Sequence, residues 1–261
     1  MVFGTFVLWV GWYGFNCGST LSMAGGGTSS TLASKVAATT TLSAAAGGIG
    51  SCFLWNYYGE TWSVERTSNG ILGGLVGITA GCSVVEPWAA IVIGFVSAAV
   101  YTASSKFVKD CLEVDDVIDA SPVHLFCGMW GCLAVGFFAT EDNLKASGFA
   151  LETEQGIFYG GGGKRLGVAL LGILCIGVWV SATMYPFFWL LNKQGMYRVS
   201  ASAEEKGVDL AEMGGSGYDF TSKPPASPVP MAGATRTLGD AKKTAIPVDV
   251  LDTTLAAKGT A

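Results

Sequence analysis

Long uncharged stretches, separated by short polar segments, dominate roughly the first three quarters of the chain. A helix needs roughly 17–25 apolar residues to cross the ~30 Å hydrocarbon core of a bilayer, and each stretch meets or approaches that length. The pattern therefore predicts about six membrane-crossing helices and an all-α, polytopic membrane helix bundle. The predicted stretches are residues 1–23, 36–58, 69–85, 87–105, 117–139 and 166–191.

Glycines recur at helical spacing within these stretches. Gly73, Gly77 and Gly81 lie four residues apart, and so do Gly14 and Gly18. Residues four apart share one face of a helix, and small side chains on that face let two helices approach closely. The glycines therefore favour helices packed inside a bundle, and they say nothing about what the protein binds or moves.

Composition agrees with a membrane protein and disfavours several other classes. Hydrophobic residues make up 50% of the chain and charged residues 13%, about half the usual charged share of a soluble domain. A net charge of −5 disfavours a nucleic-acid partner, which needs a basic surface. The seven cysteines form no C-x-x-C motif, and the sequence has no Ser-His-Asp pattern or paired catalytic carboxylates. We expect neither an enzyme nor a bound metal or cofactor.

Charged residues return after Lys193, and beyond Phe220 the chain becomes rich in Pro, Ala, Thr and Ser. Such a composition has too few large apolar groups to form a core, so we expect disorder over residues 221–261. Basic residues near the ends of the predicted helices slightly favour cytoplasmic termini. The expected organisation is a transmembrane bundle over residues 1–193 and a folded cytoplasmic tail over residues 194–220.

His124 is the single histidine of the chain, and it lies inside a predicted span. An ionisable group at that depth indicates a functional site, and burial favours the neutral imidazole. A neutral ring has one N–H donor and one acceptor nitrogen, which suits the passage of a small molecule that both donates and accepts hydrogen bonds. The alternative is a packed histidine that bonds a backbone carbonyl, and the residues alone do not separate the two.

Three aspartates, at positions 115, 116 and 119, open the same span in the segment VDDVIDASPVH. Carboxylates at a helix N-terminus interact favourably with the positive end of the helix dipole. Capping of the helix start is therefore the favoured role for Asp115. Asp119 lies deeper, five residues before His124, and a hydrogen-bonding role that supports the structure is expected there.

Aromatic rings gather in the segment GWYGFN, where Trp12, Tyr13 and Phe15 lie beside Asn16 and close to Ser19. Aromatic faces attract cations, and the attraction grows where water is scarce. These residues are therefore candidates for a cation-recruiting mouth. The alternative is a belt of aromatic side chains at the membrane interface, which needs no ligand.

These segments, taken together, resemble the ammonium transporter family. The resemblance follows the family's order and spacing over roughly residues 4–220. The matching stretches are GTFVLWVGWYGFNCGS (residues 4–19), NGILGGLVGITAGC (69–82), VEPWAAIVIG (85–94), VDDVIDASPVHLFCGMWGCLAVGFFA (114–139) and EEKGVDLAEMGGSGY (204–218). Three residues depart from the family's usual choices, namely Cys17, Val117 and Met213. None coincides with a matched pore residue, although Met213 weakens an inference about regulation through the tail.

The resemblance implies a bundle of eleven helices with two inverted repeats, one pore in each subunit and a homotrimer in the plasma membrane. This chain looks like the C-terminal half of that fold, with the second repeat, the last helix and a cytoplasmic tail. His124 matches the second of two facing pore histidines, and Phe15 matches a phenylalanine that gates the pore. Ser19 matches a hydroxyl at the outer ammonium site, and Trp12 lies in the same motif. The residues expected to support them are Asp119, Asp116 and Asn16.

The function that the resemblance implies is ammonium transport across a lipid bilayer. Ammonium would be recruited at the mouth formed by aromatic rings and a hydroxyl, and ammonia would pass along the pore histidine. Potassium has no proton to lose, so the same pore would reject it. Two alternatives on the same fold remain, a non-conducting ammonium sensor or regulatory subunit and a Rhesus-type gas channel.

We expect the chain by itself not to conduct ammonium. A pore between two inverted repeats needs both repeats, and the sequence has no second histidine. The missing N-terminal half is therefore an expected partner. Without that half, the polar inner face of the bundle, with His124 and Asp119, would be exposed to lipid.

Overall fold

A computed structural model of the chain describes residues 1–21, 28–149 and 154–215. Over these residues the chain is helical, and extended backbone pairs only in an isolated bridge between Val85 and Ala139. The structure divides into two compact units, Met1–Gln194 and Gly195–Ala261. Each unit is described by itself below.

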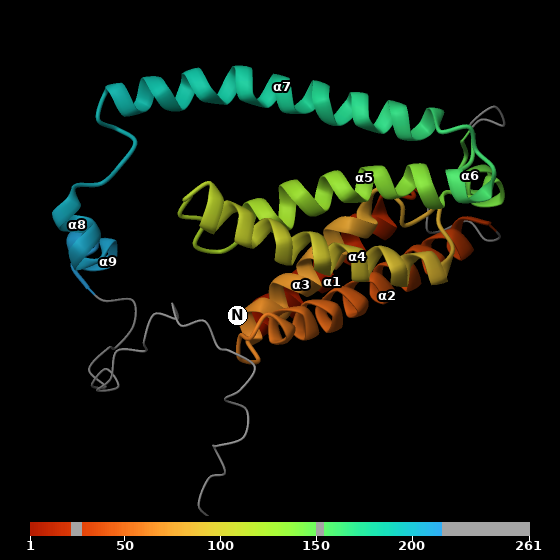
Figure 1. Cartoon of the computed structure of the whole chain (residues 1–261), viewed down its shortest axis with the longest axis horizontal. Coiled ribbons are helices and arrows are strands. Elements are labelled where there is room, and N and C mark those ends of the chain that lie inside the picture. The colour runs from red at the N-terminus through yellow and green to blue at the C-terminus, as the bar shows by residue number, and fades with distance from the viewer. Residues whose placement is uncertain (22–27, 150–153, 216–261) are drawn as a thin grey trace, which may run out of the picture. The chain divides into compact units, whose positions relative to one another are not determined.

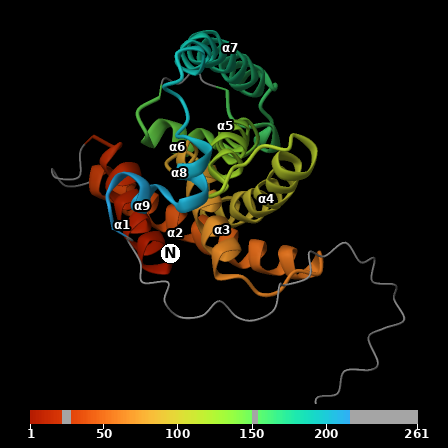
Figure 2. The ribbon, with the colours of Figure 1, turned by 90° about the vertical axis from the view of Figure 1, so that its left-hand side faces the viewer.

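The first unit is a bundle of helices that lie side by side (Figure 1; Figure 2). Helix α2 packs against both α3 and α4, and α5 contacts α3, α4 and α7. The elements are α1 (Val2–Gly18), α2 (Thr28–Tyr57), α3 (Val64–Thr79), α4 (Pro87–Lys106), the π-helical segments η1 (Phe107–Cys111) and η2 (Ser121–Phe126), α5 (Cys127–Phe138), α6 (Glu141–Ala146), the short 3-10 helix η3 (Ile157–Tyr159) and α7 (Lys164–Lys193).

Four of the described helical segments are long and apolar enough to cross a membrane. They are Ser30–Tyr57, Pro87–Cys111, Ser121–Phe138 and Lys164–Lys193. Helices α1 and α3 have 17 and 16 residues, so they fall just short of the same length. The predicted all-α polytopic membrane bundle is confirmed, whereas length and composition identify fewer spans than the six expected stretches.

Two helices begin five or more residues earlier than the uncharged stretches that predicted them. Helix α2 starts at Thr28 and α3 at Val64. The start of α3 is fixed by Ser63, whose side chain accepts a hydrogen bond from the Arg66 N–H at 3.3 Å. Glu65 lies in the first turn, where the helix dipole favours a carboxylate. Polar caps and charged first turns thus extend a helix beyond its apolar part, and a search for uncharged residues misses them.

The centre of the bundle is packed through small residues, as the spacing of Gly73 and Gly77 predicted, whereas a Cβ atom added to Gly14 or Gly18 of α1 would meet no neighbour within 4 Å. A Cβ atom added to Gly131 would lie 2.7 Å from the Gly77 carbonyl oxygen, and one on Gly73 would lie 3.2 Å from the Cys127 sulfur. At Gly94 the added atom would collide with the Ser43 carbonyl oxygen. Helices α3 and α5, and likewise α2 and α4, therefore approach each other too closely for larger side chains.

Replacing Gly94 with alanine is expected to destabilise the bundle by about 1–3 kcal/mol, because overpacking forces a backbone shift. The added Cβ atom would also lie 2.8 Å from the Ala46 Cβ atom, so neither direction offers room. Gly172→Ala in α7 is the matched control, since no heavy atom lies within 4 Å of that position. Thermal unfolding in detergent, followed by tryptophan fluorescence, measures both. Equal midpoints for the two variants would contradict the packing argument.

The second unit contains α8 (Ala201–Lys206) and α9 (Val208–Glu212) among its described residues. Ser200 caps α8 by accepting a hydrogen bond from the Ala203 N–H at 3.3 Å. Arg198 pairs with Glu204 at 2.6 Å. These helices fall within the expected tail over residues 194–220, whose cytoplasmic location stays a prediction. The expected disorder over residues 221–261 lies outside the described residues.

Candidate functional site

The predicted mouth residues Trp12, Phe15 and Ser19 lie together at the C-terminal end of α1. The Trp12 and Phe15 ring centroids are 6.1 Å apart with planes tilted by 59°. The indole N–H of Trp12 donates to the Thr79 hydroxyl at 2.9 Å, which fixes its ring against α3. Phe15 is 60% exposed, and the exposed Ser19 hydroxyl donates to the Phe15 carbonyl at 2.6 Å. Spacings of three and four residues place these side chains on one face.

Asn16 follows Trp12 by one helical turn on α1, but it is buried against α2 and not exposed at the mouth. Its side chain is 2% exposed, and its amide donates to the Thr40 hydroxyl of α2 at 3.0 Å. The Tyr13 hydroxyl shares a hydrogen bond of 2.7 Å with Thr41. These two bonds attach α1 to α2 and thereby hold the face that carries Trp12 and Phe15.

His124 lines an open chamber of about 290 Å³ between α1, α3 and η2. Its side chain is exposed within this chain. Thr5 and Asn69 are the other polar side chains of the wall, and the Asn69 amide donates to the Ile118 carbonyl at 3.3 Å. The remaining wall is apolar and is formed by Met1, Gly4, Leu8, Leu72, Ile118, Ala120 and Val123. A small molecule in this chamber meets one imidazole, one amide and one hydroxyl on an otherwise apolar surface.

Sequence reasoning did not identify Thr5 and Asn69 as wall residues. Both are buried, at 5% and 4% exposure; Thr5 lies within a predominantly apolar segment, and Asn69 lies at the start of one. A polar residue beside apolar neighbours is the feature of the sequence that could have marked each position as a candidate wall residue. It could not indicate the shared chamber with His124, because the three residues come from three separate elements.

The chamber and the mouth occupy different levels of the same helix. The chamber contacts residues 1–8, and the mouth begins at Trp12. With a rise of 1.5 Å per residue, the two levels are on the order of 10 Å apart along α1. The arrangement can hold a cation at an aromatic surface at one level and a hydrogen-bonding molecule beside an imidazole at the other.

Asp116 caps the start of η2. Its carboxylate accepts the backbone N–H groups of Ala120 and Ser121 at 2.8 and 2.7 Å. Partial burial would raise the pKa of Asp116, but the hydrogen bonds from Ser121 and Ala120 outweigh it and hold the pKa below its usual value. The capping carboxylate is therefore Asp116, one residue after the position that the sequence favoured for this role.

Asp119 is buried, and the expectation that this chain would expose it to lipid was wrong. Its side chain is 1% exposed. One carboxylate oxygen accepts from the Tyr101 hydroxyl and the Arg66 guanidinium, both at 2.9 Å. The other accepts from Lys109 at 2.6 Å and from the Ser105 hydroxyl at 2.9 Å. The sequence could not reveal these donors, since they arrive from α3, α4 and η1.

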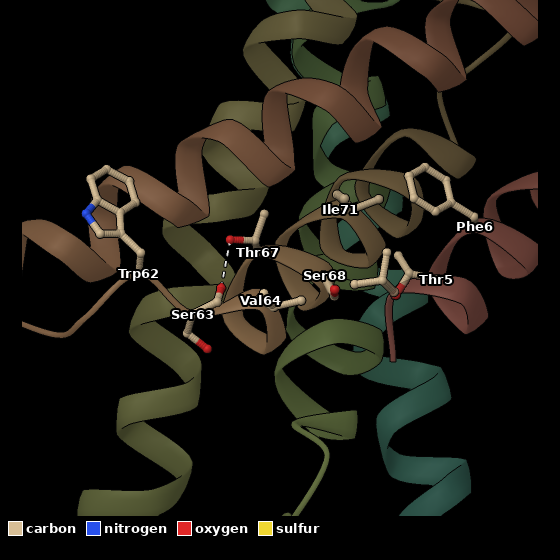
Figure 3. Close-up of a pocket in the computed structure, with 9 residues that line it drawn as sticks. Thr5, Phe6, Trp62, Ser63, Val64, Thr67, Ser68 and Ile71 are labelled. Carbon is tan, nitrogen blue, oxygen red and sulfur yellow. Dashed lines mark hydrogen bonds between the residues drawn. The ribbon is translucent and has the colours of Figure 1, made fainter. Parts of the chain in front are cut away.

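A second pocket of about 250 Å³ lies beside the start of α1 and is shown in Figure 3. Its apolar lining is formed by Val2, Phe6, Trp62, Val64 and Ile71, and the Thr67 hydroxyl donates to the Ser63 carbonyl at 2.9 Å. None of its lining residues is ionisable, and none is a predicted site residue. Among the described residues, no group of three His, Cys, Asp or Glu side chains could hold a metal ion.

Comparison with known proteins gives a consistent result. A family model described as Ammonium Transporter Family matches residues 1–218. Ammonium transporter 1 member 1 of Arabidopsis thaliana is 41% identical over 227 residues, which cover 84% of this chain and 45% of that protein. Ammonium transporter 1 member 3 of Oryza sativa subsp. japonica is 40% identical over 227 residues, with the same coverage. The chain thus spans about half the length of the curated relatives it matches.

Solved structures of similar fold include the Saccharomyces cerevisiae Mep2 crystal structure, with a TM-score of 0.68 and 29% sequence identity. That match covers 77% of this chain and 43% of the Mep2 chain. A structure described as Sensor Amt Protein has a TM-score of 0.69 and 29% identity, covering 81% of this chain and 48% of its own.

Proposed function

Since this chain belongs to the ammonium transporter family, we propose that it forms part of a conduit for ammonium and ammonia across a membrane. The observation that supports this most is the chamber in which His124 lies on an apolar wall, one level along α1 from the aromatic mouth. The chain also has several apolar helices of membrane-spanning length, which agrees with a membrane location.

At the mouth, ammonium is held by the faces of Trp12 and Phe15 and by the Ser19 hydroxyl. Cation–aromatic attraction is worth about 0.5–2 kcal/mol, enough to recruit a cation briefly without trapping it. The indole bond to Thr79 keeps the Trp12 ring from collapsing into the opening. Asn16 supports the same face by anchoring α1 to α2.

Before it enters the chamber, ammonium releases a proton to water at the exposed mouth and continues as neutral ammonia. An ammonium ion on an apolar wall has no shell of oxygens to replace water, so the deprotonated form is favoured there. Ammonia can donate to the acceptor nitrogen of His124 and accept from its N–H. Potassium cannot follow this route because it has no proton to release.

The assembly that we propose follows the family plan. A complete pore requires a second wall, which the N-terminal half of the family fold would supply, and three such subunits form a homotrimer. The plasma membrane is the proposed location, with the tail that begins after Lys193 on the cytoplasmic side. Lys106, Lys109 and Lys193 would then lie at the cytoplasmic ends of the helices.

The test is uptake of radiolabelled methylammonium by membrane vesicles from yeast cells that lack ammonium transporters and express this chain together with an N-terminal half of the family fold. We expect saturable uptake above that of vesicles from the parent strain. Ammonium should compete and potassium should not. Uptake equal to the parent strain, or equal competition by potassium, would reject the proposal.

A second candidate is an ammonium sensor, favoured by the similarity to the Sensor Amt Protein structure. A sensor would bind ammonium without moving it. Ammonium titration with tryptophan fluorescence would then report binding at the mouth, where Trp12 lies against Phe15, while the vesicles show no uptake. Binding with uptake supports the transporter.

A further inference from the structure

Two π-helical segments flank the loop that leads to His124. At the end of η1 the Leu112 N–H donates to the Phe107 carbonyl at 3.1 Å, and at the end of η2 the Cys127 N–H donates to the Pro122 carbonyl. Both bonds span five residues, and such wide turns are rare and concentrate at functional sites. His124 lies within η2, so its direction depends on this wide turn being maintained.

The loop between the two segments contains strained backbone. Glu113 and Asp119 have φ angles of 52° and 56°, in the left-handed region that side chains with a Cβ atom disfavour. Such residues persist where surrounding contacts hold them. At Asp119 those contacts are the four donors to its carboxylate, and its own carbonyl accepts the Val123 N–H at 3.1 Å.

Two of those four donors are cations from different elements. Arg66 comes from the first turn of α3, where its guanidinium also lies 4.0 Å from the centre of the Trp55 ring. Lys109 comes from η1. Asp119 therefore links η1 to α3 directly before η2 begins. Hydrogen bonds in which both partners are charged are shorter and stronger than those between neutral groups.

We propose that Arg66 and Lys109 are positioning residues for His124, acting through the buried carboxylate of Asp119. The proposal rests on the proposed function, since it concerns the direction in which His124 meets the transported molecule. The two cations hold Asp119 in its left-handed conformation, and Asp119 holds the wide turn of η2. With either cation neutralised, Tyr101 and Ser105 still bond the carboxylate, so the fold persists while η2 loosens.

A thiol of the chain itself can report whether η2 opens. Cys127 follows η2 directly, is fully buried, and its thiol contacts the Ser97 carbonyl at 3.5 Å. Cys17, which is also buried, lies in α1 and serves as the reference thiol. In Arg66→Gln and Lys109→Gln we expect alkylation of Cys127 by a small thiol reagent to be at least about threefold faster, as for a modest local opening, with Cys17 unchanged. Peptide mass spectrometry resolves the two sites.

Transport supplies the second readout. In the same vesicles, Arg66→Gln and Lys109→Gln are expected to lower the maximal rate of methylammonium uptake by about tenfold. A loss of that size corresponds to the free energy of one hydrogen bond that positions η2. The KM should change little, because recruitment occurs at the mouth, away from η2. Arg66→Lys keeps the charge and should recover most of the rate.

The matched control is Lys106→Gln. Lys106 lies at the end of α4, and its ammonium group contacts the Tyr58 and Trp55 rings, at 3.6 and 5.4 Å from their centres, rather than Asp119. The substitution removes the same charge in the same part of the bundle. Equal effects of Lys106→Gln and Arg66→Gln on rate would overturn the proposal. So would equal acceleration at Cys17 and Cys127, which signals general unfolding.

An absence of transport in the unsubstituted protein would reject the proposed function instead. The alkylation comparison would still decide whether Arg66 and Lys109 hold η2. Unchanged alkylation of Cys127 in both variants would reject the role of the two cations, whatever the transport result.

Discussion

Asp119→Ala is expected to lower the free energy of unfolding by about 3 kcal/mol, the lower end of the range for breaking a buried ion pair. The change leaves the Arg66 and Lys109 charges without their shared carboxylate. It also leaves the fully buried Tyr101 hydroxyl without its acceptor. The lower end applies because Lys109 is 35% exposed and can turn toward water.

Asp116→Ala is the control for this measurement. Asp116 lies three residues earlier and also accepts two hydrogen bonds, but from backbone groups and in a partly exposed position. Loss of such a cap costs about 1 kcal/mol. Chemical unfolding in detergent, with the purified chain, compares the two variants. If Asp116→Ala proved as destabilising as Asp119→Ala, burial of the Asp119 carboxylate would not be the source of the effect.

His124→Ala is expected to lower ammonium conduction by about tenfold or more, because losing a hydrogen-bonding group in a site of low polarity is worth about 1–3 kcal/mol. Membrane abundance should stay the same, since the His124 side chain is exposed and contributes little packing. The proposed route for ammonia loses the one imidazole that this chain supplies, and the rest of the chamber wall stays intact.

Leu125→Ala controls for changes in η2 itself, since Leu125 is the next residue and is 54% exposed. Stopped-flow measurement of internal pH in vesicles, together with immunoblotting, gives rate and abundance for both variants. Conduction by His124→Ala that matches Leu125→Ala would remove His124 from the mechanism. A loss of protein in His124→Ala alone would assign it a packing role.

Much of the mouth could be read from the sequence because its residues are neighbours along one helix. Trp12, Phe15 and Ser19 follow at spacings of three and four, so a helix alone brings them to one face. The chamber is different, because His124, Asn69 and Thr5 come from three elements. No local spacing connects them, and only packing of α1 and η2 against α3 places them on one wall.

The hydrophobic pattern by itself determined the class of fold and the packing of helices through glycine, because length in apolar residues and helical periodicity are local properties. Only the tertiary structure shows which charged side chains are buried and which groups they pair with. In the sequence, Arg66 and Lys109 were basic residues near helix ends, and Asp119 was a carboxylate with an expected structural hydrogen-bonding role but no identified partner. Folding brings both cations to one buried carboxylate, because a charge removed from water is stable only when partners from elsewhere in the chain surround it.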